Sequence, residues 1–272
     1  MPEHLNWFTV LLNKWFGGVA LAFLSALHIH ANDPVNPIPN FVAMSFAVFL
    51  VAVVFFLWLR PRISVDNPGA VQQVMEGLIT NSQGLGIRDL LEDNIEHGAR
   101  SYLPVVGAVS IFILFANAIS LIPVFESPTG HPSVPLACAI VTFLYYNFAG
   151  LKSHGPVGYA KHFGGPVWWL AWLMFPVEII SHTARLLSLT VRLWANIFAS
   201  ELIYTIFLGL LLAPTVAVSQ HHAVLGWGVL GIFAATIPSL FMVLHLFVAV
   251  VQAFVFTILP ALYIGMATSH DH

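Results

Sequence analysis

The segment FVAMSFAVFLVAVVFFLWL, from Phe41 to Leu59, carries no charged side chain and ends at Arg60. A helix needs about 20 consecutive apolar residues to cross the hydrocarbon core of a bilayer, which is about 30 Å thick. This segment therefore predicts a membrane-spanning helix. The composition of the chain agrees, because 58% of its 272 residues are hydrophobic and only 8% are charged. Soluble domains contain about 25% charged residues.

Further apolar segments follow at about 102–125, 134–151, 162–214 and 223–268. The last two are too long for one upright crossing, because at about 1.5 Å per residue each would extend near 70 Å. Such segments must tilt strongly, break or double back. We favour two long, strongly tilted helices that meet at the loop TVAVSQHH, residues 215–222. Two ordinary helical hairpins are the alternative.

These segments predict an all-α, multi-pass membrane protein with about five crossings. After Pro68, apolar residues recur at helical spacing opposite Gln and Glu side chains, which is typical of an amphipathic helix on a membrane surface. We expect this interfacial helix at about 69–95. Residues 1–40 are expected to form an N-terminal interfacial or exported segment, residues 41–268 a single membrane domain, and residues 269–272 a cytoplasmic tail.

Basic residues indicate the orientation of the chain in the membrane. Four lie between the first two crossings, and the loop after the third contains Lys152 and Lys161. The short loops at 126–133 and 214–222 contain none. Because cytoplasmic loops carry an excess of Lys and Arg, we expect the N-terminus outside and the C-terminus in the cytoplasm.

Charged residues are rare in the C-terminal half of the chain. Four lie among the 109 residues between Lys161 and Asp271: Glu178, Arg185, Arg192 and Glu201. Placing Arg or Glu at bilayer depth costs about 2.5–3.5 kcal/mol, so such residues usually mark an ion path. Steps of seven residues return to nearly the same face of a helix, whereas a step of nine lands roughly opposite. The first three residues therefore form one polar stripe that Glu201 faces away from, which indicates two polar environments separated by one fixed cation.

The strongest local motif is SLTVRLWANIFASEL, from Ser188 to Leu202, and its counterpart in the last segment is HLFVAVVQAFVF. Together they closely resemble subunit a of the F-type ATP synthase. That family shows Ser-Leu-x-x-Arg-Leu, then Asn four and Glu nine residues after the arginine, and later His and Gln seven residues apart. The matching residues here are Arg192, Asn196, Glu201, His245 and Gln252. The likeness extends from about Phe41 to Met266 and includes the pattern Pro-x-Glu-x-x-Ser that ends at Ser181.

The resemblance implies two aqueous half-channels beside a rotating ring of c subunits, each with one membrane carboxylate. Arg192 would separate the half-channels, because a guanidinium does not lose its proton. Glu201 and His245 are the candidate relay of one half-channel, and Gln252 and Asn196 are candidates to hold Arg192 in place. The candidates for the second half-channel are Glu178, Ser181, His182 and Arg185.

The resemblance also implies partners and a location. The expected partners are the c-ring, the peripheral-stalk subunit b, the remaining ATP synthase subunits and lipid of the bacterial inner membrane. ATP chemistry is expected on other subunits, because the sequence contains no Walker loop and no hydrolase motif. We expect no cofactor. We also expect no metal, because no carboxylate or cysteine completes a metal site beside His28 and His30 or beside His221 and His222. The sequence has no basic patch for nucleic acid.

The chain departs from the family pattern at several positions. Trp194 and Ala195 stand where Phe-Gly is usual, and Ser200 stands where Gly is usual. We expect these changes to alter packing against the rotor without removing proton-carrying groups. Ser120 replaces a carboxylate that some members carry, which weakens the expected role of that helix in the outer half-channel.

Two other classes of protein remain as alternatives. A secondary transporter is expected to show internal repeats, and none is visible in the sequence. A membrane scaffold with a buried ion-pair network has no need of so many polar residues at fixed spacing in an apolar background.

Overall fold

The computed structural model describes residues 6–26, 28, 33–81, 85–95, 98–122, 125–163, 171–219 and 224–268. Every regular element within these ranges is helical, which confirms the all-α prediction. The α-helices are α1 (Trp7–Ala26), α2 (Asn40–Leu59), α3 (Ala70–Ile79), α4 (Ile87–Asn94), α5 (Ala99–Ala118), α6 (Ser133–Phe163), α7 (Ala171–Ser219) and α8 (Val224–Thr268). The short 3-10 helices are η1 (Arg60–Arg62), η2 (Ile119–Leu121) and η3 (Pro128–Gly130).

Six helices in the described ranges are long and apolar enough to cross a membrane, namely α1, α2, α5, α6, α7 and α8. Five of them coincide with crossings expected from the sequence, and α1 falls in the segment 1–40. Large apolar side chains on α2 are exposed, among them Val54 at 63% and Phe49 at 55%. Such side chains suit contact with acyl chains, as expected of a multi-pass membrane protein.

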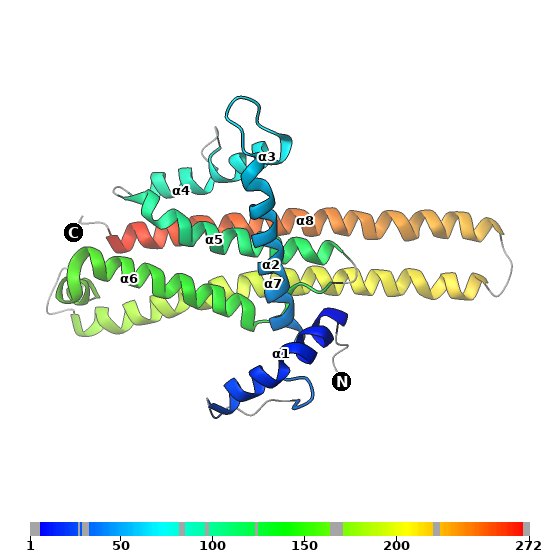
Figure 1. Cartoon of the computed structure of the whole chain (residues 1–272), viewed down its shortest axis with the longest axis horizontal. Helices are drawn as coiled ribbons and strands as arrows, with labels where there is room; N and C mark the ends of the chain where they lie inside the picture. Colours follow the sequence, from blue (N-terminus) through cyan, green and yellow to red (C-terminus); the bar gives the residue numbers. More distant parts are fainter. Residues whose placement is uncertain are drawn as a thin grey trace.

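The two long segments form single helices rather than hairpins. α7 has 49 residues and α8 has 45, so they extend about 74 Å and 68 Å. They run antiparallel and side by side (Figure 1). α7 continues through Ser219, so the first part of the expected loop is helical. The remainder of that loop, at 220–222, lies outside the described residues.

The direction of α2 sets the tilt of the long helices. α2 has 20 residues, which gives it a length of about 30 Å, and it therefore spans the hydrocarbon core only when it stands close to upright. In Figure 1, α2 runs across the direction of α5, α6, α7 and α8. A membrane that α2 crosses upright therefore has the long helices strongly tilted relative to its normal, as the sequence predicts.

Buried apolar side chains join α5, α6, α7 and α8 in two clusters. The central cluster contains Ile113, Ala139, Leu189, Leu193, Ile197 and Phe256. The second cluster, near α4, includes Leu91, Ile95, Val106, Tyr146, Ala261 and Ile264. Because lipid tails are as apolar as these side chains, close packing rather than exclusion of water stabilises such contacts.

The interfacial segment expected as one helix at about 69–95 contains two helices, α3 and α4. The chain turns between them at Gly86, where a Cβ would lie 2.7 Å from the backbone nitrogen of Asn81 and from the carbonyl oxygen of Ile79. A residue with a side chain would not fit at Gly86 without a shift of the backbone. On α3, Val71 and Val74 are exposed, as expected for residues that face lipid.

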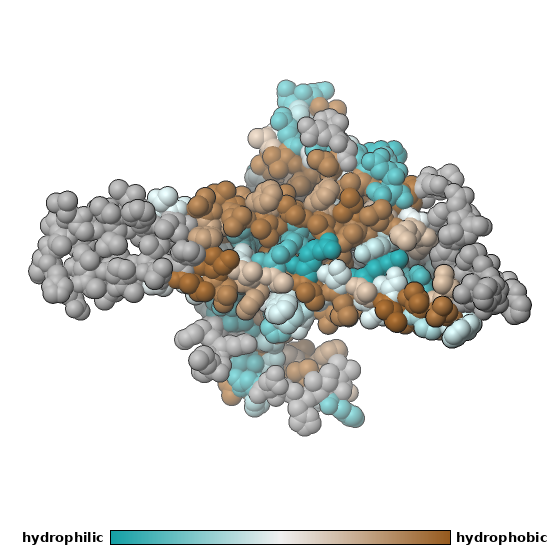
Figure 2. Space-filling view, turned by 180° about the vertical axis from the view of Figure 1, so that it is seen from behind, coloured by the Kyte–Doolittle hydropathy of each residue, from teal (hydrophilic) through white to brown (hydrophobic). Residues whose placement is uncertain are grey.

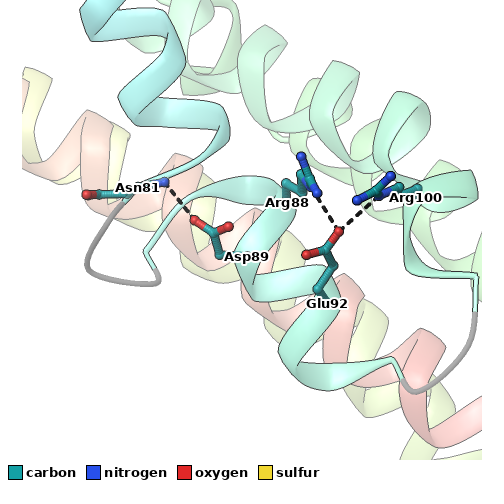
Figure 3. Close-up of polar contacts among 5 residues, drawn as sticks. All are labelled: Asn81, Arg88, Asp89, Glu92 and Arg100. Carbon is teal, nitrogen blue, oxygen red and sulfur yellow. Dashed lines mark hydrogen bonds and ion pairs between the residues drawn. The ribbon is translucent and has the colours of Figure 1, made fainter.

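Charged residues tie α4 to the start of α5 (Figure 3). Glu92 Oε1 accepts hydrogen bonds from Arg88 Nε at 2.9 Å and from Arg100 Nε at 3.2 Å. The bond from Arg88, and then that from Arg100, lowers the pKa of Glu92 below its ordinary value. The contribution of this exposed cluster to stability is therefore present at neutral pH and is lost as the pH falls through the lowered pKa.

The N-terminal helix α1 is fastened to the start of α2. Asn13 Nδ2 donates a hydrogen bond to Ile38 O at 2.9 Å, and Ile38 N donates one to Asn13 Oδ1 at 2.9 Å. Asn6 N adds a bond to Asn40 Oδ1 at 3.2 Å. α1 lies at the end of α2 that is opposite to α3 (Figure 1).

Gly265 provides a test of the contact between α8 and α4. A Cβ on Gly265 would overlap the carbonyl oxygen of Asn94. We therefore expect Gly265→Ala to push α4 away from α8 and to lower the free energy of unfolding by about 1–3 kcal/mol. The measurement is thermal unfolding of the purified chain in detergent micelles, followed by circular dichroism.

The matched control is Gly77→Ala on α3. A Cβ on Gly77 meets nothing within 4 Å, and alanine favours a helix over glycine. The control is expected to keep or raise the melting temperature. If Gly265→Ala also left the melting temperature unchanged, the contact between the two helices would not be as close as described.

Candidate functional site

The four charged residues predicted to mark the ion path all lie on α7, which is one continuous helix. Arg192 lies ten residues after His182 and nine before Glu201, which places it about 15 Å and 13 Å from them along the helix axis. Polar side chains from other helices gather at both of these levels. They form an outer cluster around His245 and Glu201, and an inner cluster around His182 and Glu178.

The outer cluster is built around the imidazole of His245, which is 8% exposed. Its Nδ1 lies 2.8 Å from Ser200 Oγ on α7. Its Nε2 lies 2.8 Å from Ser120 Oγ in η2 and 3.2 Å from the carbonyl oxygen of Asn117 on α5. Three helical elements therefore hold one histidine ring at both of its nitrogens.

Glu201 belongs to the same region but faces the loop that follows η2. Its Oε1 accepts a hydrogen bond from the backbone nitrogen of Ser127 at 3.3 Å. A Cβ on Gly130 would lie 2.9 Å from Glu201 Oε2, so the carboxylate packs closely against this glycine. Ser127 Oγ and Thr129 Oγ1 are 2.6 Å apart, and Thr129 Oγ1 donates to Asn117 Oδ1. Polar groups thus connect the carboxylate of Glu201 to the residue that contacts His245.

The inner cluster joins α6 to α7. Tyr146, only 2% exposed, places its hydroxyl 2.7 Å from His182 Nδ1. His182 Nε2 lies 3.2 Å from Glu178 Oε1, and the Glu178 side chain is 36% exposed. The three residues therefore form a continuous polar path from a buried hydroxyl to an accessible carboxylate.

Arg185 and Ser181 lie beside this path. The Arg185 guanidinium carbon is 5.1 Å from the centre of the Tyr263 ring on α8, within the range of a cation–π contact. The Tyr263 ring in turn lies 5.7 Å from the ring of Tyr146. Ser181 is half-buried on α7. The inner cluster thus receives side chains from α6, α7 and α8.

Arg192 lies between the two clusters on an exposed part of α7. Within the described ranges its guanidinium makes one hydrogen bond, from Nη2 to Ser188 Oγ at 3.4 Å. Asn196, one turn further on, is also exposed. Figure 2 shows a face on which hydrophilic side chains lie in the middle of a largely hydrophobic surface. A permanent charge on an exposed part of α7 can attract an anionic group brought by another chain.

Gln252 was expected to hold Arg192 in place, but no hydrogen bond joins these two residues in the part of the chain that the structure describes. Gln252 is 2% exposed on α8, and its Oε1 accepts no hydrogen bond from the described residues. Asn117 Nδ2, which is also buried, donates no hydrogen bond to the described residues. The helix bundle therefore contains one buried amide acceptor and one buried amide donor that remain available for other polar groups.

Three residues of the site were not identified as site residues from the sequence. Ser120, whose helix was expected to have a weaker role in the outer half-channel, is a direct partner of His245. Ser200, expected to affect packing against the rotor, is bonded to the same ring. Ser120 and Ser200 could have been identified from the sequence because both depart from the family pattern. Tyr146 had no such signal, because nothing local relates it to His182.

The comparisons with known proteins show the family of this chain. The family model described as ATP synthase A chain matches residues 42–265. The chain is 42% identical to ATP synthase subunit a of Koribacter versatilis over the whole of both chains. It is 41% identical to the Solibacter usitatus subunit over 87% of this chain and 90% of the relative. It is 42% identical to the Desulfosudis oleivorans subunit over 75% of this chain and 78% of the relative. The chain therefore belongs to the family of ATP synthase subunit a, a membrane component of the F-type enzyme.

Proposed function

We propose that this chain carries protons between the membrane surfaces and the carboxylates of a rotating c-ring, through two half-channels that Arg192 keeps apart. The observation that carries the proposal is the position of Arg192. Its guanidinium is exposed on α7 and stands between two polar clusters, each about 13–15 Å away along the helix. A role in separating the two clusters gives a function to a permanent charge that is costly on an apolar helix.

The charge of Arg192 acts on a carboxylate of the ring. At about 4 Å and an effective dielectric near 20, the attraction is about 4 kcal/mol. It favours the ionised carboxylate over the protonated one by a factor of roughly 10³. A protonated carboxyl that reaches Arg192 therefore releases its proton, and it must be neutral again before it returns to the lipid.

Glu201 and His245 serve the outer half-channel in this proposal. A carboxylate and an imidazole exchange protons readily near neutral pH. The buried amide groups of Asn117 and Gln252 that lack partners in the described structure can bind water along the path. Asn196 lies one turn from Arg192, where it can position the guanidinium or the incoming carboxylate.

Glu178, Ser181, His182 and Arg185 serve the inner half-channel, together with Tyr146. Two observations support a cytoplasmic position for this cluster. Tyr146 packs in the same apolar cluster as Leu91 of α4, and α4 belongs to a segment rich in basic residues. Cytoplasmic segments carry such an excess. The outer cluster instead adjoins the loop at 126–133, which has no Lys or Arg.

The same orientation places the N-terminus outside a bacterial inner membrane and the C-terminus in the cytoplasm. α1 then lies at the outer end of α2, as an interfacial segment fixed by Asn13 and Ile38. The c-ring faces Arg192, where Ser188 and Ala199 are small and exposed. Small residues allow another helix to approach closely. Subunit b and lipid are the partners proposed for the remaining apolar surface.

A scaffold with a buried ion-pair network predicts that Arg192 is paired within the chain. The ion pairs among the described residues join Arg88 and Arg100 to Glu92, and His182 to Glu178. Arg192 is not part of them. This difference favours the ion-translocating function over the scaffold.

Neutralising Arg192 tests the proposal directly. Arg192→Ala removes the charge that blocks a direct path between the two half-channels. We expect ATP-driven proton pumping to fall by at least about 100-fold, since the loss of about 4 kcal/mol corresponds to roughly 10³. We also expect the passive proton permeability of vesicles containing the assembled enzyme to rise.

The control for this experiment is Arg62→Ala. Arg62 lies over the Trp58 ring, outside both clusters, and its loss is expected to leave pumping within about twofold of the unmodified enzyme. Coupled pumping that survives Arg192→Ala, in an enzyme assembled to the normal amount, would contradict the proposed function.

Tyr146 provides a separate test of the inner half-channel. Tyr146→Phe removes the hydroxyl that lies 2.7 Å from His182 Nδ1 and retains the buried ring. Loss of one hydrogen bond to a group that carries charge during transfer is expected to slow pumping about tenfold. The rate is measured in inverted vesicles, and Tyr102→Phe is the control because its ring packs against Tyr145 outside the cluster. Equal rates for the two variants would remove Tyr146 from the proposed path.

A further inference from the structure

The two nitrogens of the His245 ring each face a serine hydroxyl. Ser200 Oγ lies 2.8 Å from Nδ1, and Ser120 Oγ lies 2.8 Å from Nε2. A hydroxyl has one proton to donate and two lone pairs that accept. The state of the ring therefore depends on where each serine directs its single proton.

Both serines have a second partner that accepts only. Ser200 Oγ lies 2.9 Å from the carbonyl oxygen of Ile197, and Ser120 Oγ lies 2.8 Å from that of Asn117. When both hydroxyls donate to these carbonyls, each turns a lone pair toward the ring. The ring then has an acceptor at both nitrogens, as a doubly protonated imidazolium requires.

The environments of the two nitrogens differ in one respect. The carbonyl oxygen of Asn117 lies 3.2 Å from Nε2, and a carbonyl cannot donate. Nε2 therefore keeps its proton in both states of the ring, and Ser120 and Asn117 share it. Nδ1 has Ser200 as its partner, and this hydroxyl can either donate to Nδ1 or accept from it.

We propose that Ser200 is a positioning residue that switches between Nδ1 and the Ile197 carbonyl as His245 gains and loses a proton, with Ser120 fixing the ring at Nε2. When a proton from the half-channel binds Nδ1, the Ser200 hydroxyl turns to the Ile197 carbonyl and accepts from the new N–H. When Nδ1 releases this proton, the hydroxyl turns back and donates to Nδ1. The ring accepts and releases the proton without rotating. The inference rests on the proposed relay role of His245.

Charged residues near the outer cluster come from α7 and from the segment before η3. On α7, Glu201 follows Ser200 directly, and Glu126, in the segment before η3, interacts electrostatically with Glu201. On α5 and η2, the groups that contact the ring are the backbone carbonyl of Asn117 and the hydroxyl of Ser120, which do not titrate near neutral pH.

The experiment compares substituted enzymes assembled in bacterial membranes. ATP-driven proton pumping is measured in inverted vesicles from about pH 6 to about pH 9, the range around the ordinary histidine titration. Ser200→Ala and Ser200→Gly remove the switching hydroxyl, and Ser200→Thr retains a hydroxyl. Ser120→Ala removes one of the two acceptors at Nε2. The amount of assembled enzyme and its rate of ATP hydrolysis are measured for every variant.

Two reference variants complete the set. Ser45→Ala removes a hydroxyl on α2 that also donates to a carbonyl of its own helix, Phe41 O at 2.7 Å, without a histidine partner in the described structure. His245→Gln tests the proposed relay itself.

We expect Ser200→Ala and Ser200→Gly to lower pumping at neutral pH about tenfold and to move the alkaline limb of the pH profile down by about one unit. Ser200→Thr is expected to restore both, and Ser120→Ala to lower pumping by less than about threefold, because the Asn117 carbonyl still accepts from Nε2. The inference is overturned if the Ser200 variants follow the profile of Ser45→Ala while His245→Gln is impaired. It is also overturned if Ser120→Ala has the larger effect. Normal pumping by His245→Gln would instead overturn the relay role, and the inference with it.

Discussion

A guanidinium that cannot lose its proton, fixed on a continuous helix, is the constraint on which the rest of the structure depends. The position of Arg192 between the two polar clusters is fixed, because α7 runs unbroken from Ala171 to Ser219. Its charge is costly in an apolar surrounding, and among the described residues only a long contact with Ser188 partly satisfies it. The fold thus holds a charge in a state that an anionic partner from another chain can stabilise.

The bundle supports this charge by placing different helices on its two sides. α5 and α8 run antiparallel, so that the end of α5 brings Asn117 and Ser120 to His245 while Ser110 lies by Thr257. α6 approaches α7 on the other side of Arg192 and brings Tyr146 to His182. Between the clusters lie the packed apolar side chains around Leu193 and Ile197. Two polar regions and one apolar division follow from the order in which the helices pack.

The sequence predicted this fold well wherever composition and helical spacing decide the outcome. Apolar segment lengths predicted the helices of the bundle, including both long ones. That Arg192 separates two polar environments stays a prediction from the spacing of the charged residues. The break between α3 and α4 was missed, although residues 80–86, TNSQGLG, contain the Asn, Ser and Gly that favour a turn. Gln252 was expected near Arg192 from the family pattern, yet within the described residues no hydrogen bond joins them.

Partners from distant helices were the part of the site that the sequence did not reveal. Ser120 and His245 are separated by 125 positions, and Tyr146 and His182 by 36. No periodicity relates such pairs, since the packing of one helix on another sets their contact. Ser200 was visible as a departure from the family pattern, but its meaning depends on the ring opposite. The position of a hydroxyl becomes chemically informative only when the acceptor and the ring nitrogen beside it are known.

The central claim is that two water-accessible regions approach Arg192 from opposite surfaces and do not join. The most direct measurement replaces Cys138 by Ala and then introduces Ser200→Cys or Ser181→Cys, two half-buried positions on either side of Arg192 on the same helix. A small membrane-impermeant thiol reagent is added to one surface of vesicles that contain the assembled enzyme, and the modified fraction is measured by mass spectrometry. The account predicts that the position at 200 reacts only from the outer surface and the position at 181 only from the cytoplasmic surface. Modification of both positions from a single surface would contradict it.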